Sequence, residues 1–172
     1  MKKLLLLSIT AIFLFSSELY FTPFESHQAL KKLLTWIDQA HSRIDIALYS
    51  FTNKTIAKRL KNAARRGVHI RIILDHDQNV GDRYSQIGYL AKYKNIDVFT
   101  LRGKKIKKRD DFGKMHMKLA IIDSKRLIFG SANWSHSAFK RNYELIYFVE
   151  DYALAKKSTK VFERILREAK RY

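Results

Sequence analysis

The chain has 172 residues, of which 47% are hydrophobic and only one is proline, which suits a single globular domain with its own core. It carries 34 Lys and Arg against 16 Asp and Glu, and the formal net charge of +18 favours a polyanionic partner such as nucleic acid or an acidic lipid. Cysteine is absent, which excludes disulfides, a thiolate nucleophile and Cys-based zinc or iron–sulfur sites.

The first 17 residues have the layout of a bacterial-type secretory signal, with a basic start, an apolar run from Leu4 to Phe15, and small serines. A buried core helix is the alternative, but the run has no polar face. No small-x-small pair marks a cleavage site, so an uncleaved membrane anchor also stays open. We expect residues 1–17 to be a signal peptide or anchor and residues 18–172 to form the domain. The expected location is the bacterial cell envelope, with the domain periplasmic, secreted or membrane-anchored.

The rest of the chain alternates between helical and strand periodicity. Apolar residues at helical spacing predict helices over residues 26–42, 53–67, 82–94 and 153–172. Apolar, β-branched and aromatic runs predict strands over residues 43–51, 68–75, 96–101, 118–123, 126–131 and 143–150. The first strand–helix–strand succession predicts a parallel βαβ unit, and the two strands that flank Ser124 and Lys125 predict a hairpin.

Between the third predicted strand and this hairpin, one short segment concentrates positive charge. Its six cations are Arg102, Lys104, Lys105, Lys107, Lys108 and Arg109. A solvated surface loop and a binding surface for a phosphate chain are both open interpretations. The one large apolar residue of the segment is Ile106, whereas a lipase acting at a membrane would present an apolar stripe. The segment therefore favours extended phosphate chains over membranes.

Residues 116–133, HMKLAIIDSKRLIFGSAN, place polar groups at regular intervals in an apolar stretch. His116 and Lys118 are two residues apart on a strand and share a face, and Ser131 and Asn133 repeat this relation after the next strand. Burying such groups without partners would cost about 1–3 kcal/mol each, so they must satisfy one another or bind a ligand. A lysine, an amide and a hydroxyl suit a phosphate, and a histidine adds a nucleophile or an acid–base group. The predicted chemistry is attack on a phosphodiester.

The same stretch has the spacing His116-x-Lys118-x4-Asp123-x6-Gly130-Ser131-x-Asn133. This spacing resembles, without a gap, the HKD motif of the phospholipase D superfamily. The segments IALYSFT, VHIRIILD and NYE also look like this family, so the likeness covers nearly all of residues 18–172. Because it has one such motif in a short, basic sequence with an export signal, the chain is similar to the single-domain bacterial Nuc- and NucT-type endonucleases. It resembles mitochondrial cardiolipin hydrolase-like proteins somewhat less.

The resemblance implies a phospholipase D-like α/β/α sandwich with a mixed, largely parallel sheet. It implies His116 as nucleophile, with Lys118 and Asn133 holding the non-bridging phosphate oxygens and Ser131 assisting them. Glu144 would orient the imidazole, and an ordinary strand-edge glutamate is its alternative interpretation. Asp123 has the weakest catalytic role, since an acid close to a turn can tie the hairpin to its surroundings. No metal or cofactor is expected.

The family's reaction needs a second histidine to protonate the leaving oxygen, yet this chain carries one motif. The other histidines, none followed two residues later by lysine, are His27, His41, His69, His76 and His136. A homodimer would place two copies of His116 across one phosphate, with one ring neutral and the other protonated.

We therefore predict an exported, metal-independent phosphodiesterase that cleaves nucleic acid through a covalent phosphohistidine in a site shared by a homodimer. Single-stranded DNA is the favoured substrate, and RNA and duplex DNA stay open. Tyr84, Tyr89 and Tyr93 offer stacking surfaces for bases or, as the favoured interpretation, helix core. The alternatives are a phospholipase D or cardiolipin hydrolase, and a non-catalytic DNA-binding or uptake module.

Overall fold

The computed structural model describes residues 17–107 and 111–172. The predicted leader, except for Ser17, lies outside the described residues, as do Lys108 and Arg109 of the basic segment. Across these two described ranges, no helix is both long and apolar enough to cross a membrane.

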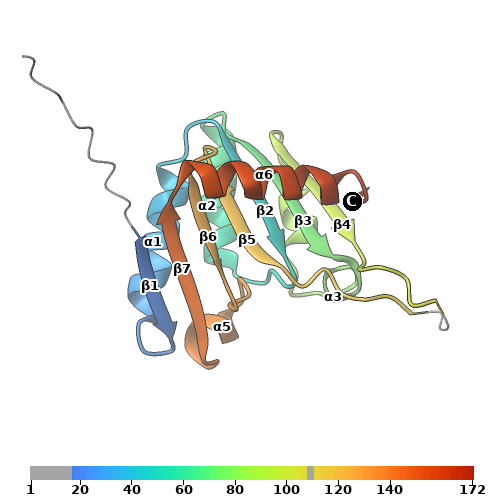
Figure 1. Cartoon of the computed structure of the whole chain (residues 1–172), viewed down its shortest axis with the longest axis horizontal. Coiled ribbons are helices and arrows are strands. Elements are labelled where there is room, and N and C mark those ends of the chain that lie inside the picture. The colour runs from blue at the N-terminus through green and yellow to red at the C-terminus, as the bar shows by residue number, and fades with distance from the viewer. Residues whose placement is uncertain (1–16, 108–110) are drawn as a thin grey trace, which may run out of the picture.

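One mixed sheet forms the middle layer of the molecule (Figure 1). Its strands are β1 (Ser17–Thr22), β2 (Arg43–Leu48), β3 (His69–Asp75), β4 (Ile96–Leu101), β5 (Lys118–Ile122), β6 (Arg126–Gly130), β7 (Glu144–Glu150) and β8 (Lys170–Arg171). Their spatial order is β1-β7-β6-β5-β2-β3-β4-β8. The predicted βαβ unit and the β5–β6 hairpin are confirmed, since β2 and β3 pair in parallel and β5 and β6 antiparallel.

Helices cover both faces of this sheet. They are α1 (Ser26–Asp38), α2 (Lys54–Arg65), α3 (His76–Asn79), α4 (Ile87–Leu90), α5 (His136–Lys140) and α6 (Tyr152–Leu166). The apolar sides of α1 and α2 bury Leu33, Ile37 and Leu60 against one face, and α6 buries Phe162 against the other (Figure 1). The predicted α/β/α sandwich with a mixed sheet is therefore confirmed.

The expectation that the sheet is largely parallel is wrong. Within the described strands, only the β2–β3 and β3–β4 pairs are parallel. The pairs β1–β7, β2–β5, β4–β8, β5–β6 and β6–β7 are antiparallel. The physical reason is the length of the connections: a parallel pair needs a long crossover such as α2, whereas the short turn between β5 and β6 reverses the chain.

Two local predictions also differ from the structure, and one strand was not predicted. The helix predicted over residues 82–94 is only the single turn α4, because Asp82 and Ser85 accept hydrogen bonds from nearby backbone N–H groups and hold turns instead. The helix predicted to reach residue 172 ends at Leu166, and the last residues pair with β4 as β8. Strand β1 was not predicted; it is an edge strand with alternating burial, held by β7.

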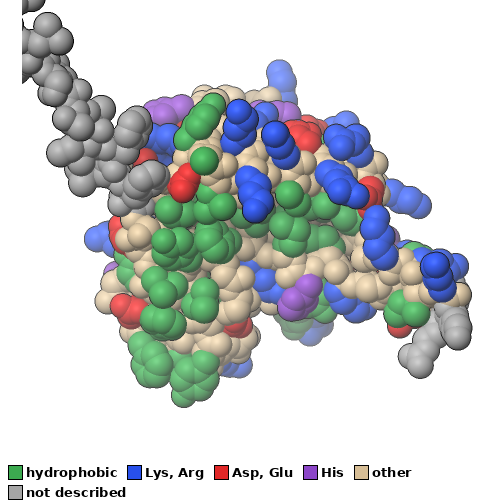
Figure 2. All heavy atoms as spheres, viewed as in Figure 1, with side chains coloured by type: hydrophobic (Ala, Val, Ile, Leu, Met, Phe, Trp, Pro, Cys, Tyr) green, Lys and Arg blue, Asp and Glu red, His purple; other side chains and the backbone are tan. Residues whose placement is uncertain are grey.

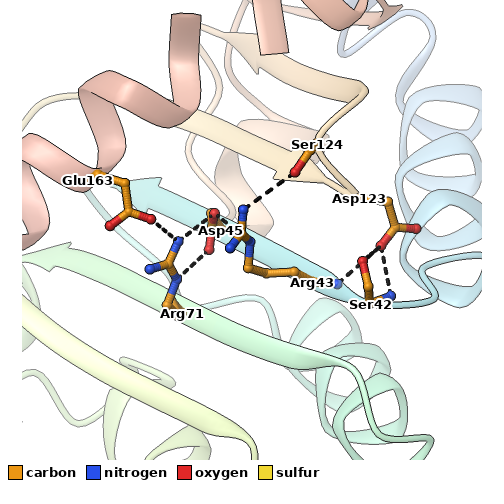
Figure 3. A network of polar contacts seen from close by, with 7 residues as sticks. All are labelled: Ser42, Arg43, Asp45, Arg71, Asp123, Ser124 and Glu163. Atoms are coloured by element: carbon orange, nitrogen blue, oxygen red, sulfur yellow. Dashed lines mark hydrogen bonds and ion pairs between the residues drawn. The ribbon is translucent and has the colours of Figure 1, made fainter. Parts of the chain in front are cut away.

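A buried ion pair fastens α6 to the sheet (Figure 3). Asp45 of β2, only 1% exposed, accepts hydrogen bonds from Arg71 Nε at 2.7 Å and from Arg71 Nη2 at 2.8 Å. Arg71 Nη2 also donates to Glu163 of α6 at 2.7 Å. The hydrogen bonds from Arg71 to Asp45 are the main cause of a raised pKa for the Arg71 guanidinium, which stays charged. The position of α6 over the sheet is therefore fixed by charge as well as by apolar packing.

Candidate active site

His116 and Lys118 form the centre of the site, at the start of β5. His116 is exposed on the segment that leads into the strand, and Lys118 is the first strand residue. Lys118 Nζ lies 3.0 Å from His116 Nδ1 and donates to the His116 carbonyl oxygen at 2.9 Å. Burial lowers the pKa of Lys118, and the negative charge of Glu144 partly offsets this effect. The lysine is thus a close hydrogen-bond donor beside an accessible imidazole.

Tyr49, which sequence reasoning did not assign to the site, packs against this pair. Its ring centroid lies 4.6 Å from that of His116, and Lys118 Nζ lies 5.3 Å from the Tyr49 ring centroid. Tyr49 N donates to the Met117 carbonyl oxygen at 3.0 Å. Strand pairing brings it there: Leu48 lies opposite Lys118 in the antiparallel β2–β5 register, so Tyr49 follows beside Met117, the residue next to His116.

Ser131 and Glu144 lie side by side at the ends of β6 and β7. The Ser131 hydroxyl donates to the Glu144 carboxylate and accepts from Leu145 N at 3.1 Å. Asn142 Nδ2 donates to the other Glu144 oxygen at 3.2 Å. Among the described residues, no hydrogen bond joins Glu144 to His116, so the predicted orientation of the imidazole by Glu144 is not formed within one chain.

Asn133 is held by the backbone of the segment after β2. Its Oδ1 accepts from Ser50 N at 3.2 Å. Because this bond fixes the carbonyl end of the amide, Nδ2 is the end that can donate to a phosphate oxygen. The same segment carries Tyr49, so one stretch of backbone aligns Asn133 and the His116 ring.

Gly130 of the motif has a steric role. A Cβ atom at this position would lie 2.1 Å from the Leu145 carbonyl oxygen and 3.2 Å from Ile146 Cα. Only glycine permits this approach of β6 to β7 without a backbone shift. The approach is what sets Ser131 beside Glu144.

Asp123 lies at the far end of β5 from His116, because the strand separates the two residues. Its carboxylate accepts from Ser42 N at 2.9 Å, from the Ser42 hydroxyl at 2.9 Å and from Arg43 N at 3.1 Å (Figure 3). It also accepts from His41 N at 2.9 Å. The structure does not bring Asp123 into the His116 cluster. This location supports a structural role, in which Asp123 ties the hairpin to the start of β2.

We expect Asp123→Asn to lower the free energy of unfolding at pH 7 by about 1–3 kcal/mol and to leave turnover almost unchanged. Burial alone would raise the pKa of Asp123, but the hydrogen bonds from Ser42, His41 and Arg43 outweigh it and hold the pKa below its ordinary value. This stabilisation is present above the unfolded-state pKa of about 3.9 and is lost as the pH falls through the lowered folded-state pKa. Urea unfolding should show a smaller difference in the free energy of unfolding between the variant and the wild type at acid pH than at pH 7. A large loss of turnover at unchanged stability would contradict this role.

A basic cavity of about 410 Å³ opens beside His116. Its cationic wall consists of Arg102, Lys104, Lys114 and Arg164. Residues 102–107 and 111–114 lie side by side as a narrow arm, in which Gly103 N donates to the Gly113 carbonyl oxygen at 2.8 Å. This arm projects from the body, and Lys and Arg side chains lie along it and along α6 (Figures 1 and 2).

The described cations of the predicted basic segment fall into two groups, one at the cavity and one on the arm. Arg102 and Lys104 line the cavity, although they also pair with Asp77 and Glu168 at 2.8 and 2.5 Å. Lys105 and Lys107 are exposed on the arm. Sequence reasoning missed Lys114 and Arg164, and the basic composition of the last helix was the only signal for the latter. Across residues 17–107 and 111–172, no group of three or more His, Asp or Glu side chains is arranged to hold a metal ion.

Known proteins are similar to this chain in both sequence and fold. A family model described as "Cardiolipin synthase, PLD-like domain" matches residues 33–166. NucT from Helicobacter pylori is 38% identical, with a TM-score of 0.89 over 92% of this chain and 99% of that chain. Nuc from Salmonella typhimurium, a phospholipase D family member, is 25% identical, with a TM-score of 0.77 over 92% and 98% of the two chains.

Curated relatives give the same family. Mitochondrial cardiolipin hydrolase of Mus musculus is 33% identical over 143 residues, which cover 83% of this chain and 60% of that protein. Phospholipase D of Rickettsia felis is 36% identical over 125 residues, which cover 73% of this chain and 58% of that protein. The chain therefore spans little more than half the length of these relatives. Together with the HKD spacing and the sandwich fold, these matches show that the chain belongs to the phospholipase D superfamily, in its Nuc and NucT type.

Proposed function

We propose that this chain is a phosphodiesterase that cleaves nucleic acid, preferentially single-stranded DNA, through a covalent intermediate on His116. The observation that carries the proposal is the placement of an exposed His116, with Lys118 Nζ 3.0 Å away, in the wall of a cavity that four cations also line. The histidine supplies a nucleophile and the cations supply binding energy for the phosphates on either side. The likeness to NucT and Nuc over nearly the whole of those chains supports the same reaction.

In the proposed reaction, an imidazole nitrogen of His116 attacks phosphorus and the bond from phosphorus to the leaving oxygen breaks. The leaving oxygen takes a proton from a second acid. Water then attacks the phosphohistidine and gives its proton to the second acid, which lost its own in the first step. The nitrogen–phosphorus bond breaks, and both groups return to their starting states. Lys118 Nζ and Asn133 Nδ2 donate to the non-bridging oxygens, whose negative charge grows as the nucleophile adds.

We propose that the second acid is His116 of another copy of this chain. An apolar cavity of about 320 Å³ adjoins the catalytic lysine, with Leu119, Phe129 and Leu154 among the residues that line it beside Lys118. Figure 2 shows hydrophobic side chains gathered on this face below α6. A two-fold contact across the face would cover it and would bring the two histidines to one phosphate. We further propose that residues 1–17 carry the chain into the cell envelope, as a cleaved signal or an anchor.

Phospholipase D or cardiolipin hydrolase activity is the second candidate, because several curated relatives are mitochondrial cardiolipin hydrolases and the chain has exposed apolar surface. A DNA-binding or uptake module without turnover is the third. The described His116, Lys118 and Asn133 have no feature that would prevent chemistry, which favours an enzyme.

Side-by-side hydrolysis of four substrates tests the proposal: single-stranded DNA, duplex DNA, RNA and cardiolipin vesicles. We expect single-stranded DNA to be cut fastest, with little sequence preference, and at the same rate in EDTA. DNA binding should weaken steeply with salt, because the cations displace counterions from the phosphates. Faster hydrolysis of cardiolipin would favour a lipase, and activity lost to EDTA and restored by one divalent ion would favour a metal-dependent mechanism. Tight DNA binding without turnover would favour the module.

A further inference from the structure

Two large aromatic side chains stand exposed next to the site. Phe24, in the loop after β1, is 75% exposed, and Tyr143, immediately before β7, is 80% exposed. Their ring centroids lie 5.8 Å apart, with the ring planes tilted by 51°. Figure 2 shows hydrophobic side chains gathered at this lower corner of the molecule. The pair contributes little to the core, so its apolar surface is available to a ligand.

These rings border an open cavity of about 570 Å³, a size typical of small-ligand sites. Phe21 and Leu145 complete its apolar lining. Its polar wall includes Ser131 and Glu144, so the cavity adjoins the phosphodiester site directly.

The two cavities beside the site differ sharply in charge. The basic cavity that contains His116 has Arg102, Lys104, Lys114 and Arg164 in its wall. The lining of the aromatic cavity, as far as the structure describes it, contains no Lys or Arg and includes the acids Glu25 and Glu144. Carboxylates repel a phosphate, whereas they accept hydrogen bonds from the amino groups of a base.

We propose that Phe24 and Tyr143 form a nucleobase subsite, where one unpaired base flanking the scissile phosphate stacks on the rings. The substrate class rests on the proposed function. The phosphate chain would run into the basic cavity while the base enters the aromatic one. A base held in a duplex cannot offer both of its faces and its hydrogen-bonding edge to a protein, so the subsite selects unpaired strands. Of the three tyrosines considered from the sequence, Tyr89 and Tyr93 pack against the core, as favoured there, whereas Tyr84 is 57% exposed.

The test measures affinity in the full chain carrying His116→Ala, so that no substrate is cut. Fluorescence anisotropy compares a short single-stranded oligonucleotide with versions that hold an abasic site at successive positions. Phe24→Ala and Tyr143→Ala should each weaken binding of the complete strand about 5- to 150-fold. Each variant should have no effect when the stacking base is missing. Tyr152→Ala removes an aromatic side chain that is 70% exposed at the start of α6, and it should leave both affinities unchanged.

Equal weakening on complete and abasic strands, or none on either, would overturn the base subsite. Conversion of a dimer to a monomer by Phe24→Ala, seen by light scattering, would instead show that the pair lies between two copies. In a chain that keeps His116, slower hydrolysis of cardiolipin vesicles by Phe24→Ala, with strand affinity unchanged, would assign the cavity to an acyl chain. Cutting by the unmodified chain tests the proposed function separately, because the affinity ratios need no turnover.

Discussion

Replacing His116 by alanine is expected to lower the rate of phosphodiester hydrolysis by a factor on the order of 10⁴ or more. The reason is that the imidazole supplies the attacking nitrogen, and no neighbouring side chain can replace it. Lys118 lies 3.0 Å away but is held as a donor to His116. Single-turnover cutting of a labelled oligonucleotide measures the loss.

Fold and DNA affinity should survive this change. His116 is exposed, and the cations of the neighbouring cavity remain in place. The matched control is His27→Ala, which removes another exposed histidine, on α1, and should leave the rate unchanged. A His116→Ala variant that keeps a tenth of the wild-type rate would refute the assignment of the nucleophile.

Asp45→Ala should cause the largest loss of stability, about 3–5 kcal/mol in the free energy of unfolding. The substitution leaves Arg71, whose side chain is only 13% exposed, without its two hydrogen bonds to Asp45. Glu163 alone would then face the buried guanidinium. Because Glu163 belongs to α6, which also carries Arg164 into the cavity beside His116, the loss should loosen the helix that borders the site.

Urea unfolding measures this effect. The matched control is Asp38→Ala, which breaks an ion pair with Arg59 whose side chains are 38% and 46% exposed, and it should cost no more than about 1 kcal/mol. If Asp45→Ala is too unstable to purify, Asp45→Asn keeps the shape and removes only the charge. A cost for either Asp45 variant as small as that of Asp38→Ala would show that the buried pair does not hold α6.

Much of the sandwich could be predicted from local pattern, because α1, α2 and β2 to β7 carry strong periodicity. The errors lie in segments whose secondary structure depends on tertiary contacts. Residues 17–22 become a strand only because β7 offers an edge to pair with, and residues 170–171 pair with β4 after the helix has ended at Leu166. The mixed pairing of the sheet likewise depends on connection length, which periodicity does not report.

In the site, too, local spacing predicts some contacts and tertiary structure determines the others. Fixed spacing along one strand is enough to bring together His116 and Lys118. Ser131 instead lies beside Glu144, and Asn133 is held by Ser50. The spacing cannot place Asp123 with them, because the five residues of β5, at about 3.3 Å each, hold it at the opposite end of the strand. Tyr49 and Arg164 reach the site through strand pairing and helix packing, which no local motif encodes.

We have proposed that two copies of the chain build a single phosphodiesterase site with two histidines. Heterodimers of one wild-type and one His116→Ala subunit, isolated through two different affinity tags, test this claim most directly. A shared site predicts that cutting of single-stranded DNA by the heterodimer falls to about a hundredth of the wild-type rate or below, since every site lacks one histidine. A heterodimer that works at half the wild-type rate would show independent sites and would contradict the account.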